Sequence, residues 1–189
     1  MSTIAKEPET SHVVLVHGFM DTGSVFKSLR RQLERNGHRC LAPNLRPRDA
    51  RNGIEPLAEH LRQEIEGQIP HQQSFSLIGF SMGGLVARHY LQQLDGAKRC
   101  ERLITISSPH QGTLMAWLHP SKGAQQMRPG SNFLEDLAAT ESRLGEIPVI
   151  SYRTPFDLMI LPPRSSRLKQ AYADHRLPVP MHRFMITDR

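Results

Sequence analysis

Cysteine is scarce in this sequence: only Cys40 and Cys100 occur among its 189 residues. Each lies on or beside an apolar, strand-like segment, and neither has the spacing of ligands around a metal ion. We therefore expect two buried free thiols, with neither a disulfide framework nor a metal site. No cofactor is expected either.

Long apolar runs are also missing, and aromatic residues make up only 6% of the chain. The core must therefore consist mainly of Leu, Ile, Val and Ala, which is usual for helices packed on a sheet. No run approaches the roughly 20 residues of a membrane-spanning helix, so no transmembrane segment is expected. The opening MSTIAKEPETSH lacks the basic and then hydrophobic stretch of a secretory signal. These features predict a cytoplasmic protein with flexible residues 1–11.

Acidic residues are outnumbered by basic ones, which gives a formal net charge of +6. Such a balance can favour anionic partners, but it does not identify one. The densest basic row lies at helical spacing opposite apolar positions, which indicates a solvated helix face: Lys27, Arg30, Arg31 and Arg35. Because no nucleic-acid motif with interleaved aromatics accompanies it, no nucleic-acid partner is expected.

Strand-like apolar segments alternate with segments of helical periodicity over the first 107 residues. The alternation predicts strands at 12–18, 38–43, 75–80 and 102–107 and helices at 25–35, 54–65 and 85–94. Near-continuous apolar strands are typical of a parallel sheet with helices on both faces. The pattern therefore predicts an α/β fold.

The second half of the chain is less regular. A Gly- and Pro-bearing stretch, 109–130, is too short for a large lid, so we expect little or no lid over the site. A helical segment at 131–144 and strands at 147–152 and 178–186 follow. No repeat or second core is visible, which predicts a single domain over residues 1–189.

A G-x-S-x-G sequence, Gly79 to Gly83, lies between a predicted buried strand and an amphipathic helix. The glycines permit a sharp strand-to-helix turn that lifts the Ser81 side chain above the sheet. At the helix N-terminus, the Met82 amide is placed to stabilise an oxyanion. Ser81 is therefore the predicted nucleophile, and a tight structural turn is the alternative.

A serine nucleophile needs a histidine base that a carboxylate orients. In this fold class the acid and then the base follow the serine along the chain, each in a loop after a late strand. Asp157 in a Pro-rich loop and His182 near the chain end fit this order. Asp136 and Asp174 are rival acids in more polar segments, and His175 in the charged segment ADHR is the reserve base.

The first predicted strand ends in His17-Gly18-Phe19-Met20, where a loop amide would complete the oxyanion hole. Phe19 is the predicted donor, and Met20 is the alternative. We expect His17 to order this loop, and we place His17 and Met20 beside the substrate. Residues 113–118, with Met115, would line the acyl side of the site or simply pack as a short helix.

Several segments in order resemble the α/β-hydrolase superfamily, and more narrowly its small bacterial lipase and esterase members. The matching segments are VVLVHGFMDTGSVF, GFSMGG, ISSPHQGT, RPGSNFLEDL and the loop around Asp157. The resemblance implies an α/β-hydrolase fold and cofactor-free hydrolysis of carboxylic esters. It also implies a triad of Ser81, Asp157 and His182 with Phe19 and Met82 as oxyanion donors. His110, in a loop that frames the site in those enzymes, is expected to order that loop beside the substrate.

The chain departs from this superfamily at its C-terminus, because only seven residues follow His182. A missing final helix would leave part of a sheet face exposed, so we expect a trimmed end or a covering chain in an oligomer. Small-molecule or lipid esters are the predicted substrates. The alternatives are thioester, amide or lipid-linked acyl groups on the same triad, and a non-catalytic binding protein of this fold.

Overall fold

The computed structural model describes residues 11–168 and 171–186. The predicted flexible segment, residues 1–11, therefore lies outside the described residues apart from Ser11. Six parallel strands form one sheet in the order β2-β1-β3-β4-β5-β6. Their bounds are His12–Val16 (β1), Arg39–Leu41 (β2), Phe75–Phe80 (β3), Cys100–Ile106 (β4), Val149–Arg153 (β5) and Ala173–Arg176 (β6).

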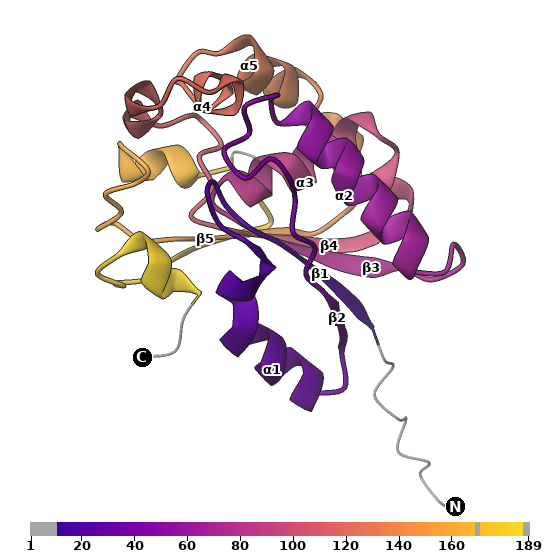
Figure 1. Cartoon of the computed structure of the whole chain (residues 1–189). Coiled ribbons are helices and arrows are strands. Elements are labelled where there is room, and N and C mark those ends of the chain that lie inside the picture. The colour runs from indigo at the N-terminus through magenta and orange to yellow at the C-terminus, as the bar shows by residue number, and fades with distance from the viewer. Residues whose placement is uncertain (1–10, 169–170, 187–189) are drawn as a thin grey trace, which may run out of the picture.

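Helices cover both faces of this sheet, which confirms the predicted α/β-hydrolase fold (Figure 1). Figure 1 shows α2 and α3 on one face, with α4 and α5 beyond them, and α1 on the other face. The α-helices are Lys27–Arg35 (α1), Glu55–Gln68 (α2), Met82–Gln93 (α3), Lys122–Gln126 (α4) and Asn132–Ala139 (α5). The 3₁₀ turns are Gly23–Phe26 (η1), Gly96–Lys98 (η2), Leu114–Leu118 (η3), Glu141–Leu144 (η4), Pro163–Ser166 (η5) and His182–Met185 (η6). None of the helices in the described part of the chain has the length and apolar character that a membrane crossing requires.

The core lies mainly between the sheet and α2 and α3. Leu57, Leu61 and Ile65, at steps of four along α2, are fully buried against the sheet. Strand residues such as Leu15 and Leu77 are also fully buried, on opposite faces of the sheet. Because both faces of the central strands are covered, their sequences are nearly continuous apolar runs.

The last strand prediction is wrong, because residues 178–186 form no strand and His182 lies in η6. Pro178 and Pro180 lack the N–H groups that a strand ladder needs. Instead the polar ADHR segment forms β6, which pairs with β5 at the edge of the sheet. Three of its four residues are exposed, so β6 has no buried face that would require apolar alternation, and its sequence carried no strand signal.

The sheet face on the α1 side is covered unevenly. Near α1, Leu15 and Phe26 are fully buried, whereas Ile104 on β4 and Tyr152 on β5 are only partly buried. This matches the expectation of a partly exposed sheet face. The oligomer that would cover it stays a prediction.

The start of α3 lies unusually close to the sheet. A Cβ atom added at Gly83 would lie 2.0 Å from the carbonyl oxygen of Val16, and one at Gly79 would lie 2.5 Å from the Cα atom of Gly84. Such distances leave no room for a side chain. The glycines therefore let α3 begin directly beside the carboxyl ends of β1 and β3.

We predict that Gly83→Ala lowers the free energy of unfolding by about 2 to 3 kcal/mol, because the new methyl group forces α3 away from β1. Gly67→Ala is the matched control, since nothing lies within 4 Å of a Cβ at this exposed position in α2. That control should raise the free energy of unfolding by about 0.5 kcal/mol. Urea unfolding of both variants measures the difference, and equal effects would contradict the close approach.

Candidate active site

Ser81 lies on a strained turn between β3 and α3. Its φ of 54° and ψ of −127° are rare for a residue with a side chain. The Ser81 N–H donates to the carbonyl oxygen of Ile106 on β4 at 2.9 Å, and a Cβ at Gly18 would lie 2.9 Å from the Ser81 Cβ. The turn is thus held from both neighbouring strands, as the G-x-S-x-G prediction requires.

Asp157 and His182 are joined although 25 residues separate them. The Nδ1 atom of His182 lies 2.8 Å from Oδ2 of Asp157. The other carboxylate oxygen accepts the N–H groups of Met159 and Ile160 at 2.9 and 3.0 Å. The Asp157 side chain is 1% exposed, so these partners stabilise a buried negative charge. Such a carboxylate holds the proton on Nδ1, which leaves Nε2 as the basic nitrogen.

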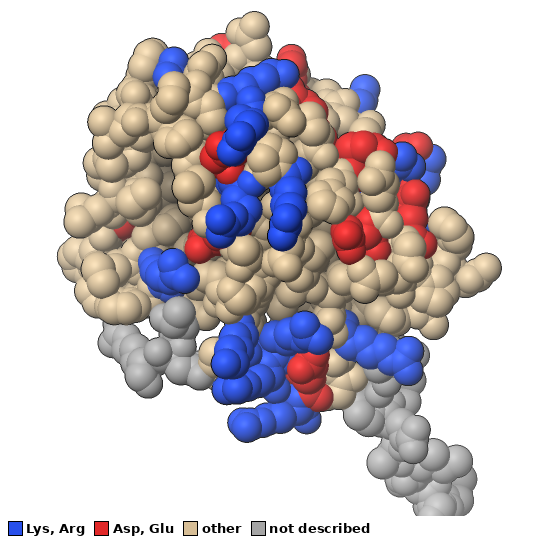
Figure 2. Space-filling model, in the orientation of Figure 1, with Lys and Arg blue, Asp and Glu red and all other residues tan. Residues whose placement is uncertain are grey.

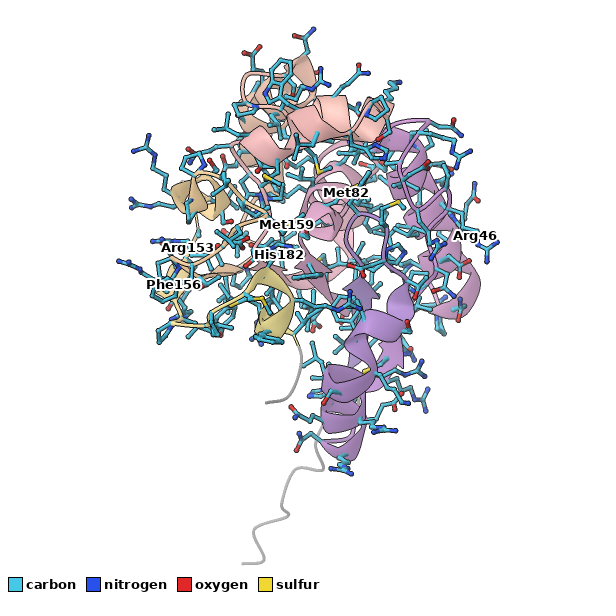
Figure 3. All side chains as sticks on the ribbon, turned by 60° about the vertical axis from the view of Figure 1, so that its left-hand side comes forward. Arg46, Met82, Arg153, Phe156, Met159 and His182 are labelled. Atoms are coloured by element: carbon cyan, nitrogen blue, oxygen red, sulfur yellow. The ribbon has the colours of Figure 1, made fainter. Side chains whose placement is uncertain are left out.

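Ser81 and His182 line the same cavity of about 510 Å³, together with Met159. The Phe80 ring packs on the His182 imidazole with their centroids 4.7 Å apart. Figure 3 shows His182 and Met159 on neighbouring segments near the centre of the molecule, with Phe156 farther out. The structure therefore brings the predicted nucleophile, base and acid to one end of the sheet.

The rival residues are engaged elsewhere. His175 lies on β6 and stacks on Tyr152 with ring centroids 4.9 Å apart. Asp174 pairs with Arg153 at 2.8 Å, and Asp136 lies on α5. None of the three rivals lines the cavity of Ser81.

A second, narrower cavity of about 240 Å³ also opens at Ser81. It shares Phe19 and Met159 with the wider one. Its remaining walls are largely apolar and include Met115, as expected, with Pro109, Ala116, Leu118, Met127 and Ile160. Ser81 thus lies where an apolar cavity meets a wider, more polar one that Asp21 and Arg183 line.

The two predicted oxyanion donors are free to bind. Within the described residues, the amides of Phe19 and Met82 donate to no backbone carbonyl. Met82 begins the twelve-residue helix α3, whose dipole favours negative charge. The Met20 amide is not available, because it donates to the carbonyl oxygen of Arg48 at 2.8 Å. The exposed Met20 side chain lines the wider cavity instead.

His17 and His110 do not contact the space where a substrate would bind. Both are buried, and neither is among the residues that line the two cavities. His17 accepts the Leu45 N–H at Nε2 and lies 2.9 Å from the Gly18 carbonyl oxygen through Nδ1. His110 bonds Thr105 at 3.1 Å and Arg88 at 3.4 Å. The structure therefore corrects their expected place beside the substrate, while the geometry suits the expected ordering of loops.

Thr113 is a residue that the sequence did not single out. Its buried hydroxyl donates to the Met159 carbonyl oxygen at 2.8 Å and accepts the Leu161 N–H at 2.9 Å. The Leu114 N–H also donates to the Leu161 carbonyl oxygen. These bonds tie the acid loop to η3. No sequence spacing links Thr113 with Met159 and Leu161, which lie more than 40 residues later, although Thr113 is the last residue of the segment ISSPHQGT.

A family model described as the alpha/beta hydrolase fold matches residues 11–176 of this chain. The chain belongs to this alpha/beta hydrolase family. The match includes the Ser81 turn and the Asp157 loop but ends before His182. The assignment of the base in this hydrolase therefore depends on the geometry of η6.

Curated relatives of this alpha/beta hydrolase include a protein named lysosomal thioesterase PPT2. The human protein is 29% identical over 118 residues, which cover 58% of this chain and 39% of the relative. The mouse protein is 28% identical over the same length. The chain therefore matches about two fifths of the length of these relatives.

Solved structures share the fold of this hydrolase at low identity. The mature lipase BlEst2 of Bacillus licheniformis superposes with a TM-score of 0.73 at 17% identity, covering 95% of this chain and 88% of that one. Polyneuridine aldehyde esterase gives a TM-score of 0.63 at 18% identity, with 94% of each chain covered. These likenesses show the fold.

The buried histidines make stability depend on pH. Burial, and then the charge of Arg88, lower the pKa of His110 well below its ordinary value, and burial also lowers that of His17. The native state therefore keeps both rings neutral where the unfolded chain takes up protons. Their stabilisation is complete above about pH 6.5 and declines as the pH falls below that value.

We predict that His110→Gln flattens this decline by up to about 1.4 kcal/mol per pH unit below about pH 6. Urea unfolding between about pH 7.5 and pH 5 measures the slope for the wild type and the variant. A His110→Gln slope equal to that of the wild type would show that this ring is protonated in the native state.

Proposed function

We propose that this hydrolase cleaves carboxylic esters or thioesters through an acyl-enzyme on Ser81. One observation carries the proposal: the Nδ1 atom of His182 lies 2.8 Å from the buried Asp157 carboxylate, and His182 shares a cavity with Ser81. A structural turn at Ser81 would need neither partner. Family membership and the esterase, lipase and thioesterase names among its relatives support a hydrolase.

The reaction begins when Ser81 Oγ attacks the acyl carbon and Nε2 of His182 takes the hydroxyl proton. The imidazolium that forms is stabilised by Asp157, whose charge is held by the Met159 and Ile160 amides. The tetrahedral oxyanion accepts hydrogen bonds from the Phe19 and Met82 amides.

Collapse of that intermediate breaks the bond to the leaving alcohol or thiol, which takes the proton from His182. A water molecule then attacks the acyl-enzyme, with His182 again accepting a proton, and the acid product leaves. All of these steps use protein side chains, backbone amides and water, in line with the cofactor-free hydrolysis that the sequence predicts.

The two cavities suggest how a substrate is arranged. The narrow apolar cavity suits the acyl group, because its walls are the side chains of Met115, Met127 and their neighbours. The wider cavity suits the leaving group, since Asp21 and Arg183 offer charged groups there. The substrates that this arrangement favours are esters or thioesters with an acyl chain of modest length and a polar leaving group.

A thioester is the second candidate, favoured by the thioesterase name of the curated relatives. The relation covers 39% of the human relative, so its activity reaches this chain only as a proposal. The acyl half of the mechanism is the same for both classes, and only the leaving group differs. The predicted cytoplasmic location and the amide alternative stay predictions.

We predict that Ser81→Ala lowers kcat/KM by a factor of about 10⁴ or more, because the variant lacks the nucleophile. The substrates are p-nitrophenyl esters of increasing acyl length and thioesters of the same acyl groups, followed by the release of nitrophenol or thiol. Ser76→Ala, at a partly buried position earlier on β3, is the matched control and should keep the wild-type rate.

The ratio of thioester to ester turnover at one acyl length decides between the two leaving groups. An unchanged rate in Ser81→Ala would disprove the assignment of the nucleophile. Absence of turnover in the wild type over both series would favour the non-catalytic binding protein.

His182→Ala should lower kcat by a factor of about 10³ or more, because His182 is the histidine bonded to the buried Asp157 carboxylate, whereas His119, which lines the narrow cavity with Ser81, bonds Ser121. His175→Ala should change kcat by less than about twofold, since this ring stacks on Tyr152 on the edge of the sheet. Steady-state kinetics on the best ester of the series measure both. If His175→Ala is the inactive variant, His175 is the base and the assignment of His182 is wrong.

A further inference from the structure

Large apolar side chains are exposed around the mouth of the site. Three belong to η3 and three to the acid loop, and each is between 50% and 76% exposed. We name these six residues the apolar rim: Leu114, Trp117, Leu118, Phe156, Leu158 and Met159. Hydrogen bonds from Thr113 and Leu114 to the acid loop hold the two segments side by side.

A substrate molecule inside the site would cover only part of this rim. Leu118, Leu158 and Met159 line the cavities, but Leu114, Trp117 and Phe156 line neither of them. Their exposure is therefore not needed to hold an acyl chain or a leaving group. Contiguous exposed apolar groups of this size mark surfaces that bind a protein or a membrane.

Arg128 contacts the rim, whereas Arg46 lies across the site from Phe156, with His182 and Met159 between them (Figure 3). The Arg128 guanidinium carbon is 4.2 Å from the centre of the Trp117 ring. Exposed Arg46, Arg48 and Arg51 lie in the loop between β2 and α2, and Figure 2 shows Lys and Arg side chains gathered over this part of the surface. Of these three, Arg51 is paired with an acidic side chain, that of Asp49.

The arginine loop is attached to the segments around the site. The carbonyl oxygen of Arg48 accepts the Met20 N–H at 2.8 Å, and that of Ala50 accepts the Gly123 N–H at the start of α4 at 2.9 Å. Arg183 lines the wider cavity, where Asp21 lies 3.4 Å from it. Apolar groups and arginines, some of them paired with Asp21 and Asp49, thus meet at one end of the molecule.

We propose that the apolar rim docks on an anionic membrane surface. Apolar side chains that enter the boundary between headgroups and acyl chains, with arginines on the phosphate groups, are the recognition elements of proteins that lie on such surfaces. Docking in this way needs no membrane-spanning helix. It also places the openings of both cavities against the lipid, and it does not depend on catalysis.

The single tryptophan of the chain, Trp117, belongs to the rim and reports on its environment. We expect the emission of this protein to shift to shorter wavelength on vesicles of phosphatidylcholine with about 30% phosphatidylglycerol. Co-sedimentation should show binding at least about tenfold weaker to phosphatidylcholine alone. The Ser81→Ala variant should bind as the wild type does, so this test stands apart from that of the catalytic role.

Two double variants separate the rim from general adsorption of a basic protein. Leu114→Ser with Phe156→Ser should weaken binding about tenfold or more, because both side chains lose their burial in lipid. The control is Tyr172→Ser, which should bind the vesicles as the wild type does, because Tyr172 is 84% exposed but lies outside the rim.

Arg46→Gln with Arg48→Gln should weaken binding to the anionic vesicles by about tenfold at low salt. The matched control is Arg31→Gln with Arg35→Gln on α1, across the sheet from α2 and α3, which should have little effect. Equal binding by the Leu114 and Phe156 variant and the wild type would overturn the proposal. So would an emission shift that follows protein concentration without vesicles, because it would place a second copy of the chain on the rim.

Discussion

The buried carboxylate of Asp157 organises the open end of the sheet. With 1% of its side chain exposed, it must have partners for both oxygens, and it finds them in two amides of its own loop and in His182. One charge thus fixes the shape of the acid loop and the place of η6, a segment with little regular structure of its own. The loop is in turn bonded to η3 through Thr113. The walls of both cavities follow from these few bonds.

The Ser81 turn depends on a different constraint, which is steric. Close packing at Gly83 and Gly18 lets the α3 N-terminus and the first loop meet around Ser81, so the strained φ of this residue is enforced by its surroundings. The same packing holds Gly18 and the start of α3 against Ser81, next to the predicted oxyanion donors Phe19 and Met82. Steric contact therefore positions the predicted nucleophile, and hydrogen bonds to a buried charge position the predicted base.

Much of this arrangement could be predicted from the sequence because the relevant signals are local. The buried strands and the apolar stripe of Leu57, Leu61 and Ile65 follow directly from hydrophobic periodicity. The edge strand β6 could not be predicted, since three of its four residues are exposed and it has no buried face to give that signal. The positions of His17 and His110 also depend on partners far along the chain, such as Leu45 and Arg88. Only the folded structure shows that both ring nitrogens of each of these histidines already have hydrogen-bond partners away from the two cavities.

The short elements between β4 and β5 explain why the surroundings of the site are apolar. Each of η3, α4, α5 and η4 has eight residues or fewer, so they form walls and leave the site without a large cover. The narrow cavity, which we propose for the acyl group, is lined in part by Leu118 and Met159, which are 76% and 50% exposed. Exposed apolar area of this kind is unfavourable in water and becomes favourable only against another apolar phase. Arg183 and Arg51 pair with Asp21 and Asp49, while Arg128 packs on the Trp117 ring. An anionic lipid surface would satisfy both the apolar groups and the remaining positive charge, whereas a second copy of this basic chain would satisfy only the apolar groups.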